Sequence, residues 1–376
     1  MLVQRCPRSS SSGSRSSPSW CWPGEATLRP SNPEPAPRPA AEALRIDAVD
    51  VHYGRFRAVR GATLVLAPGE LVALLGRSGS GKTTLLRAVA GFERVTGGEI
   101  RLAGELIESP LHHVPAHRRS VGLVFQEYAL FPNQTVAGNI GYGLSRGERG
   151  RVESLLRMAH LEGLEGRYPH QLSGGQQQRV ALLRSLAPRP RVLLLDEPFS
   201  NLDAGLRVQM RDEVAAILRA EGMTALLVTH DRADAMAIAD RVAVMDGGEI
   251  IEVATPRALY FEPATRTAAS YGGDVQFVPG EAFGAAAESP LGQLPLARPF
   301  RGPCDLLIRP EWLRLRHGGT PAQVCARRFE GAVTRLDLAV GGQLLRMTAA
   351  SSELADPGDV VGVTVAVPAV PFPRSE

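Results

Sequence analysis

Lysine is nearly absent from this chain of 376 residues. Lysine and arginine together number 42, yet Lys82 is the single lysine among them. Long apolar runs are also missing, because no uninterrupted stretch reaches the roughly 18 apolar residues of a membrane-spanning helix. The amino terminus has arginines but lacks the apolar segment of a secretory signal. We attribute the arginine bias to overall composition and draw no function from it.

Cysteine and excess charge are scarce as well. The four cysteines, Cys6, Cys21, Cys304 and Cys325, show no close spacing of metal ligands, so we expect a reduced, cytosolic compartment. The net charge of +3 arises entirely from residues 1–40, where five arginines accompany two glutamates. Because the remaining chain is formally neutral, we expect no nucleic-acid-binding surface.

The lone lysine lies in a glycine-rich stretch. Residues 76–83 match the pattern G-x-x-x-x-G-K-[ST], a phosphate-binding loop that leads into a helix. Glycines let the backbone turn tightly, so that successive N–H groups form an anion nest. Lys82 adds a point charge for the outer phosphates, and Thr83 offers a hydroxyl for Mg²⁺. The residues expected to contact the nucleotide here are Gly76, Arg77, Ser78, Gly79, Ser80, Gly81, Lys82, Thr83 and Thr84.

The pattern around this loop is typical of an α/β domain. Strand-like alternation covers 44–53 and 61–75, and short apolar strands are predicted at Val121–Phe125, Val192–Leu195 and Ala225–Val228. Strands that alternate with helices, with the loop at a strand end, indicate an α/β fold with a parallel sheet. Helices are predicted at about 84–90, 151–160, 176–187, 204–220 and 231–239.

Two flanking regions differ in composition from this domain. Residues 1–40 are rich in Ser, Pro and Arg, so we expect a disordered low-complexity extension without an assigned function. Pro, Gly and Ala spacers separate short β-like runs after residue 275, which predicts a small C-terminal all-β domain of barrel type. The runs lie at 305–309, 323–329, 332–339, 343–348 and 359–367. The expected division is therefore 1–40, 43–275 and 276–376.

Two acids follow the apolar strand Val192–Leu195. Asp196 and Glu197 would lie beside the phosphates, because ligands of α/β sheets bind at the carboxyl ends of strands. Asp196 suits the coordination shell of Mg²⁺, and Glu197 can polarise an attacking water as general base. An apolar run that ends in Asp is weak evidence alone and gains weight beside the glycine loop.

A second glycine turn is the decisive element. Leu172-Ser173-Gly174-Gly175-Gln176 forms an anion-binding turn at the start of the following helix. One nucleotide needs one such nest per subunit, whereas in a two-fold dimer the turn of one subunit can cover the γ-phosphate held by the other. The pattern therefore predicts a homodimer that binds two ATP molecules between its copies.

With these motifs in this order, residues 44–275 resemble the ATP-binding subunit of an ABC transporter, which implies a P-loop NTPase fold, ATP and Mg²⁺. The resemblance implies that 172–176 is the signature motif and that Asp196 and Glu197 form the Walker B pair. It assigns four further residues: Tyr53 to adenine stacking, Gln126 to Mg²⁺ and the membrane subunits, Asp203 to the dimer interface, and His230 to the γ-phosphate. The implied metal ligands are Thr83, Gln126 and Asp196, and the implied catalytic residues are Glu197, His230, Lys82 and Gln126.

Three of these side chains also have plainer interpretations. Tyr53 could be an ordinary strand aromatic, Gln126 a surface amide and His230 a histidine that simply starts a helix. Asn201 stands where the family commonly has alanine, a departure that removes no chemical group from the site.

The carboxyl-terminal part indicates which class of ABC transporter this chain resembles most. Leu306–Glu311 resembles a segment of the accessory TOBE, or OB-like, β domain of maltose, polyamine, sulfate and ferric-iron importers. Stretches 167–170, 176–179 and 187–190 look most like the ferric-iron branch. The resemblance implies a motor on the cytoplasmic face of the membrane, docked through 127–132 on permease subunits that a solute-binding protein supplies. Polyamine, phosphonate or sulfate uptake stays open.

Two other classes of function are considered. A non-transport ABC ATPase would usually carry two cassettes or a long coiled coil, and this sequence shows one signature and no sustained heptads. A regulatory module, in which the β domain restrains the ATPase, could coexist with transport.

Overall fold

The computed structural model describes residues 42–352 and 355–374. The prediction of disorder for residues 1–40 lies outside the described residues. Within them, no helix has both the length and the apolar character needed to cross a membrane.

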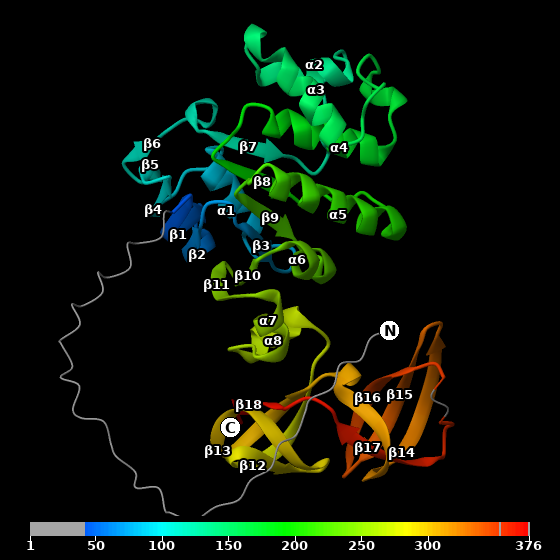
Figure 1. The fold of residues 1–376 in the computed structure, drawn as a ribbon. Helices are drawn as coiled ribbons and strands as arrows, with labels where there is room; N and C mark the ends of the chain where they lie inside the picture. Colours follow the sequence, from blue (N-terminus) through cyan, green and yellow to red (C-terminus); the bar gives the residue numbers. More distant parts are fainter. Residues whose placement is uncertain (1–41, 353–354, 375–376) are drawn as a thin grey trace, which may run out of the picture. The chain divides into compact units, whose positions relative to one another are not determined.

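A six-stranded sheet organises the first part of the described chain (Figure 1). Its order is β11-β10-β3-β9-β8-β7, in which β11 is antiparallel to β10 and every other neighbouring pair is parallel. The strands are β3 (Leu71–Leu75), β7 (Val121–Val124), β8 (Val192–Asp196), β9 (Ala225–Thr229), β10 (Arg241–Asp246) and β11 (Glu249–Ala254). The predicted α/β class with a parallel sheet is confirmed.

The central strands are apolar on both faces because each face packs against its own core. In β3, Val72 and Leu74 join one core, whereas Leu71, Ala73 and Leu75 join the other. Strands β8 and β9 divide in the same way. A strand buried on both faces must be continuously apolar, which is the sequence signal that predicts it.

Helices cover the two faces of this sheet. Helix α1 (Lys82–Ala90) packs into one core, and α4 (Gly174–Leu186), α5 (Ala204–Ala220) and α6 (Arg232–Ile238) contribute to the other. The remaining helices are α2 (Val136–Ile140), α3 (Arg149–Met158), α7 (Pro256–Phe261) and α8 (Arg266–Gly272), with short 3₁₀ turns between some elements.

An antiparallel five-stranded sheet lies against α1 and shares its core. Its order is β2-β1-β4-β5-β6, with β1 (Leu44–Tyr53), β2 (Phe56–Leu66), β4 (Gly97–Leu102), β5 (Glu105–Ser109) and β6 (His112–His113). The single strand predicted at 61–75 is wrong, because the chain turns after Leu66. Gly69 adopts φ of 75° in that turn, and the Glu70 amide donates to the Ala67 carbonyl at 3.2 Å. This region therefore supplies strands to two different sheets.

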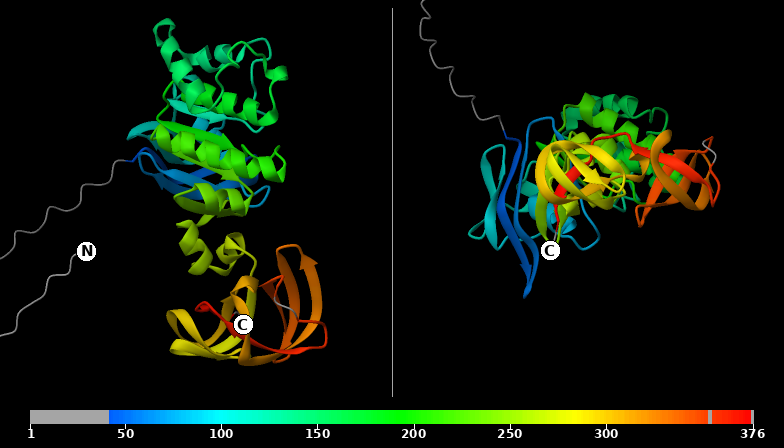
Figure 2. Two further views of the ribbon diagram at one scale, coloured as in Figure 1. Left: turned by 45° about the vertical axis from the view of Figure 1, so that its right-hand side comes forward. Right: turned by 90° about the horizontal axis from the view of Figure 1, so that it is seen from below.

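The carboxyl-terminal part of the described chain is all β, as predicted. Figures 1 and 2 show its strands as two groups, the sheets β12-β13-β18 and β16-β15-β14-β17. The strands are β12 (Gln276–Ser289), β13 (Gly292–Ile308), β14 (Leu313–Glu330), β15 (Val333–Val340), β16 (Gln343–Ala350), β17 (Val360–Val365) and β18 (Val370–Pro373). Strand β12 was missed by the sequence analysis because Pro279, Gly280 and Gly284 interrupt its apolar pattern.

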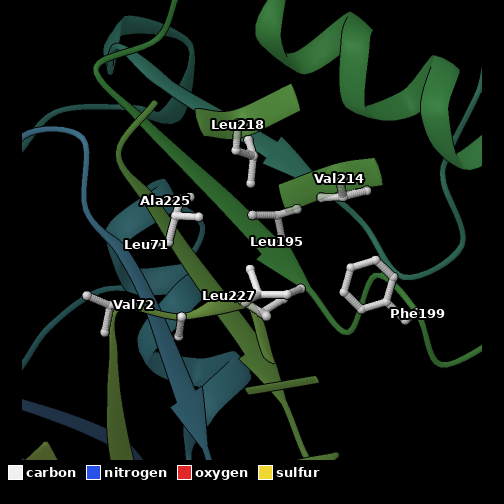
Figure 3. Close-up of a pocket in the computed structure, with 10 residues that line it drawn as sticks. Leu71, Val72, Leu195, Phe199, Val214, Leu218, Ala225 and Leu227 are labelled. Atoms are coloured by element: carbon white, nitrogen blue, oxygen red, sulfur yellow. The ribbon is translucent and has the colours of Figure 1, made fainter. Parts of the chain in front are cut away.

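A small void lies in the core between the parallel sheet and α5 (Figure 3). It measures about 10 Å³, and its lining is apolar, with Leu195, Phe199, Val214 and Leu227 among the side chains. A buried water needs about this much space and two to four polar partners, which these side chains do not offer. The void is therefore a packing feature and not a ligand site.

Candidate active site

The phosphate loop connects the buried strand β3 to helix α1. Gly79 and Gly81 have φ of 81° and 100°, the left-handed region that glycine adopts without steric cost. A side chain on Gly81 would overlap the carbonyl oxygen of Ala58, and one on Gly76 would overlap that of Met245. Close backbone approach and left-handed geometry thus explain why these positions hold glycine.

Lys82 begins α1 and is only 5% exposed. Its Nζ donates to the carbonyl oxygens of Gly76 at 2.8 Å and Arg77 at 3.0 Å, which holds the ammonium inside the loop. Burial lowers the pKa of Lys82, and the charges of Glu197 and Asp196 act in the opposite direction. An ammonium has three donors, so within the described part of the chain one remains for another acceptor.

Thr83, in the first turn of α1, lies close to Asp196, the last residue of β8. The Thr83 hydroxyl donates to Oδ1 of Asp196 at 3.3 Å, although the two residues are 113 positions apart in sequence. Burial raises the pKa of Asp196, and the hydrogen bond from Thr83 lowers this pKa by less. A hydroxyl beside a carboxylate is a pair of hard oxygen donors.

Glu197 leaves the end of β8 in an unusual backbone conformation. Its φ is 45°, a left-handed geometry that costs a residue with a side chain about 1 kcal/mol or more. Its amide still donates to the Val228 carbonyl of β9 at 2.9 Å. The carboxylate lies 3.0 Å from Nδ1 of His230, which follows β9. Adjacent strand ends thus place an acid and a histidine together.

The segment after Glu197 contacts the loop that contains Gln126. Asn201 donates from its side-chain amide to the Gln126 carbonyl oxygen at 3.0 Å, while the Gln126 side chain is exposed. Asp203 caps α5 by accepting from the Leu206 amide at 2.9 Å. Asn201, the departure noted from the sequence, therefore links two loops at the edge of the site.

Tyr53 ends β1 close to the helix that follows the phosphate loop. Its ring is 45% exposed, and its hydroxyl donates to Oε2 of Glu93 at 2.7 Å. Burial raises the pKa of Tyr53, whereas the Thr84 hydroxyl near it lowers the pKa. The half-exposed ring presents an aromatic surface beside α1.

The signature residues start helix α4. The Ser173 hydroxyl accepts from the Gln176 amide at 3.3 Å, and the Gln176 side chain accepts from the Ser173 amide at 3.0 Å, which forms a capping box. Gly175 packs against α5, because a side chain there would lie 3.0 Å from Sδ of Met210. In the described residues, no hydrogen bond joins 172–176 to the loop 76–83, so these two glycine-rich segments are separate within one chain.

Sequence reasoning missed two supports of the site. Arg207 on α5 forms an ion pair at 2.9 Å with Asp231, the residue that directly follows His230. The turn between β10 and β11 supports the phosphate loop, since the Gly248 amide donates to the Ser80 carbonyl at 3.1 Å. Gly247-Gly248 predicts a turn there, but no sequence signal identifies the neighbour that the turn contacts.

Buried Asp234 on α6 makes stability depend on pH. Burial, followed by the charge of Asp231, raises the pKa of Asp234 from 3.8 to about 6, while Arg207, Arg211 and His230 lower it by less. The folded protein therefore holds this proton more tightly than the unfolded chain. That contribution to stability is complete below pH 3.8 and is lost as pH rises through about 6.

We expect Asp234→Asn, which cannot ionise, to gain stability relative to the native protein as pH rises from 4 to 8. The gain should not exceed about 3 kcal/mol. Urea unfolding of both proteins at several pH values measures it. A stability difference that does not change with pH would contradict the assignment.

Comparison with known proteins agrees with this geometry. The ABC transporter family matches residues 59–200. The chain is 45% identical over 304 residues to the Fe(3+) ions import ATP-binding protein FbpC of Mesorhizobium japonicum, a match that covers 77% of this chain and 84% of the relative. The chain belongs to the ATP-binding proteins of ABC transporters, a family of ATPases.

Two further relatives carry the names of other importers. The chain is 44% identical to the sulfate/thiosulfate import ATP-binding protein CysA 2 of Chromobacterium violaceum, over 86% of this chain and 93% of that one. It is 40% identical to the spermidine/putrescine import ATP-binding protein PotA of Pseudomonas fluorescens, over 86% and 95%. Among solved structures, cbiO1 of Clostridium perfringens, part of the ABC transporter complex cbiONQ, matches with a TM-score of 0.54 at 28% identity, covering 58% of this chain and 90% of that one.

Proposed function

We propose that this chain is the ATP-hydrolysing motor subunit of an importer that takes up ferric iron. The observation that carries the motor function is the convergence of Lys82, the Thr83–Asp196 pair and the Glu197–His230 pair at neighbouring strand ends. Ferric iron is supported by the relative named for Fe(3+) import and by the sequence stretches that resemble that branch. Sulfate and polyamine uptake are the alternatives, since relatives with those names are nearly as similar; phosphonate uptake also stays open.

The phosphate loop binds the nucleotide. In this proposal, Lys82 and the amides of 76–84 hold the β- and γ-phosphates, and Tyr53 stacks on adenine. The loop is preformed, because its glycines and the two hydrogen bonds of Lys82 fix its shape. A preformed nest at a helix start favours an anion through aligned N–H groups and the helix dipole.

Glu197 acts as general base and His230 positions the γ-phosphate. Water attacks the γ-phosphorus, its proton passes to the Glu197 carboxylate, and the bond to the β-phosphate oxygen breaks to release ADP and phosphate. The backbone of Glu197 supports this role. Its φ of 45° is a costly conformation, and in this conformation the carboxylate lies 3.0 Å from His230. Such outliers persist where the surrounding structure fixes them, commonly at functional sites.

The residues near the phosphates fit Mg²⁺. Thr83 and Asp196 offer a hydroxyl and a carboxylate, and the side-chain carbonyl of Gln126 is exposed for a third contact. Mg²⁺ usually keeps several waters and is bound through one or two carboxylates together with substrate phosphates, so few protein ligands are needed. Bound Mg²⁺ would neutralise charge on the phosphate oxygens.

The working unit is a homodimer. Residues 172–176 of one copy would cover the γ-phosphate held by the loop of the other, with Asp203 near the interface. Support comes from the two separate glycine-rich segments in one chain and from the exposed signature serine, whose helix start has no partner in its own phosphate loop among the described residues.

The motor docks on integral-membrane permease subunits at the cytoplasmic face, and a solute-binding protein supplies the cargo. Leu130 and Phe131 are half-buried, and the ring of Phe131 lies 4.3 Å from that of Tyr142. A groove of about 470 Å³ is lined by residues that include Leu144, Val152 and Gly141, which directly precedes Tyr142. An amphipathic permease helix could place apolar side chains there.

We also propose that the chain divides functionally at about residue 275. Residues 43–275 hold the nucleotide motifs, and 276–376 form the accessory β domain of the TOBE type. Core packing supports this division, because one apolar cluster is built almost entirely from residues after 269.

A charge in the signature tests the motor and the dimer together. A side chain on Gly174 would meet only Leu202, at 3.9 Å, and an acid is favourable in the first turn of a helix. We expect Gly174→Asp to fold and bind ATP normally but to hydrolyse it about tenfold to a hundredfold more slowly, because its carboxylate repels the partner's γ-phosphate. Gly174→Ala is the control, and unchanged hydrolysis by Gly174→Asp would contradict the shared site.

A further inference from the structure

Helix α8 contacts the surroundings of the phosphate loop through Tyr271. The Tyr271 hydroxyl donates to Oδ1 of Asp246 at 3.0 Å. Arg77 of the loop, Asp246, Arg266 and Tyr271 are among the residues that line a pocket of about 250 Å³. Burial and the bond to Asp246 raise the pKa of Tyr271, so its hydroxyl stays protonated and remains a donor.

Asp246 ends β10, directly before the Gly247–Gly248 turn that contacts the phosphate loop. Two residues later, the Gly248 amide donates to the Ser80 carbonyl at 3.1 Å, and the Gly248 carbonyl accepts from the Arg60 amide at 2.8 Å. Gly248 has φ of 93°, so the turn has a geometry that glycine adopts most readily. A shift of Asp246 would therefore move the partner of a loop carbonyl.

Helix α8 is also fastened to the all-β part of the chain. Arg266 forms an ion pair with Asp305 of β13 at 2.5 Å, and its guanidinium lies 4.1 Å from the centre of the Phe277 ring. Arg309, which is 0% exposed, donates to the carbonyl oxygens of Ala269 in α8 at 3.3 Å and of Tyr260 at 2.9 Å. These contacts hold the first residue and the middle of α8 against the all-β part.

We propose that Tyr271 is a positioning residue for nucleotide binding. Its hydroxyl holds Asp246, the turn 246–248 holds the Ser80 carbonyl, and α8 thereby links the phosphate loop to the all-β part. The loop must sit in one position for its amides to converge on phosphate, and this link fixes it from outside the loop. The inference rests on the proposed function, because Tyr271 matters to binding only if the loop binds ATP.

Equilibrium binding of ATP to the full-length chain tests this role. We expect Tyr271→Phe, which keeps the ring and removes the hydroxyl, to bind ATP about threefold to tenfold more weakly. This is less than the full effect of a lost hydrogen bond to a carboxylate, because Tyr271 acts through the turn and does not touch the nucleotide. Asp246→Ala should weaken binding equally, and Tyr271→Phe/Asp246→Ala no further, because both changes break one interaction. Asp246→Asn keeps an acceptor oxygen and should bind nearly as the native chain does.

Steady-state kinetics separate positioning from loss of folding. KM for ATP should rise in Tyr271→Phe while kcat changes less than about twofold, because no reacting group is removed. Native ATP affinity in Tyr271→Phe, or effects that multiply in the double variant, would overturn the inference.

Two further measurements test the connection to the all-β part and ATP binding itself. Asp305→Ala, which breaks the ion pair with Arg266, should weaken ATP binding in the same direction and by less. Native affinity in this variant would overturn the connection to the all-β part. Failure of the unmodified chain to bind ATP would instead contradict the proposed function, so the two failures can be told apart.

Discussion

Glu197→Gln should hydrolyse ATP about a hundredfold to ten-thousandfold more slowly than the native protein while still binding it. Glutamine keeps the size and polarity of the side chain but cannot take the proton of the attacking water. The contact with Nδ1 of His230, now 3.0 Å from the carboxylate, can persist with an amide oxygen. Binding survives because the phosphates are held by Lys82 and the loop amides.

The same variant should accumulate as an ATP-bound dimer, because the nucleotide that joins the two copies is no longer consumed. Phosphate release measures the first effect, and light scattering with and without ATP measures the second. Glu288→Gln is a matched control, since it removes an equal charge at an exposed position of β12. Hydrolysis at the native rate in Glu197→Gln would remove Glu197 from the role of general base.

Lys82→Ala should bind ATP about a hundredfold to a thousandfold more weakly, because it removes a buried charge that faces the phosphates. The two loop carbonyls that Lys82 now satisfies, those of Gly76 and Arg77, would also lose their donor. Lys82→Met is a useful second variant, since it fills the space of the stem without the charge. Native affinity in both variants would contradict the nucleotide assignment.

Because lysine is so scarce, chemical labelling can test the nucleotide site independently of the variants. Lys82 is the single lysine, so an amine-reactive ATP analogue has one side-chain target besides the α-amino group. We expect mass spectrometry to find the label on Lys82 and excess ATP to prevent the labelling. Labelling that ATP does not reduce would place Lys82 outside the nucleotide site.

Local chemistry explains which parts of the fold could be predicted from the sequence. Strands β3, β8 and β9 are continuously apolar because both faces are buried, and few other arrangements tolerate such runs. Ser173 and Gln176 were expected to start a helix, and they do so through a capping box. The phosphate loop needs glycine at fixed places, which makes its pattern visible in one sequence.

The features that could not be predicted depend on contacts between distant segments. Tyr271 on α8 contacts Asp246 of β10, and Arg207 on α5 contacts Asp231 just before α6. These contacts depend on how distant segments pack, and neither local sequence indicates that packing. The left-handed backbone of Glu197 is similar, because nothing in Asp-Glu-Pro reports a positive φ.

Uptake of radiolabelled ferric iron tests the central claim most directly. Cells of the source organism that lack other iron uptake systems would carry either the native chain or Lys82→Ala at equal levels. We predict that the native chain supports uptake, that Lys82→Ala abolishes it, and that excess spermidine or sulfate does not compete. Iron uptake that is unchanged by Lys82→Ala, with loss of spermidine or sulfate uptake instead, would contradict the assignment to ferric iron.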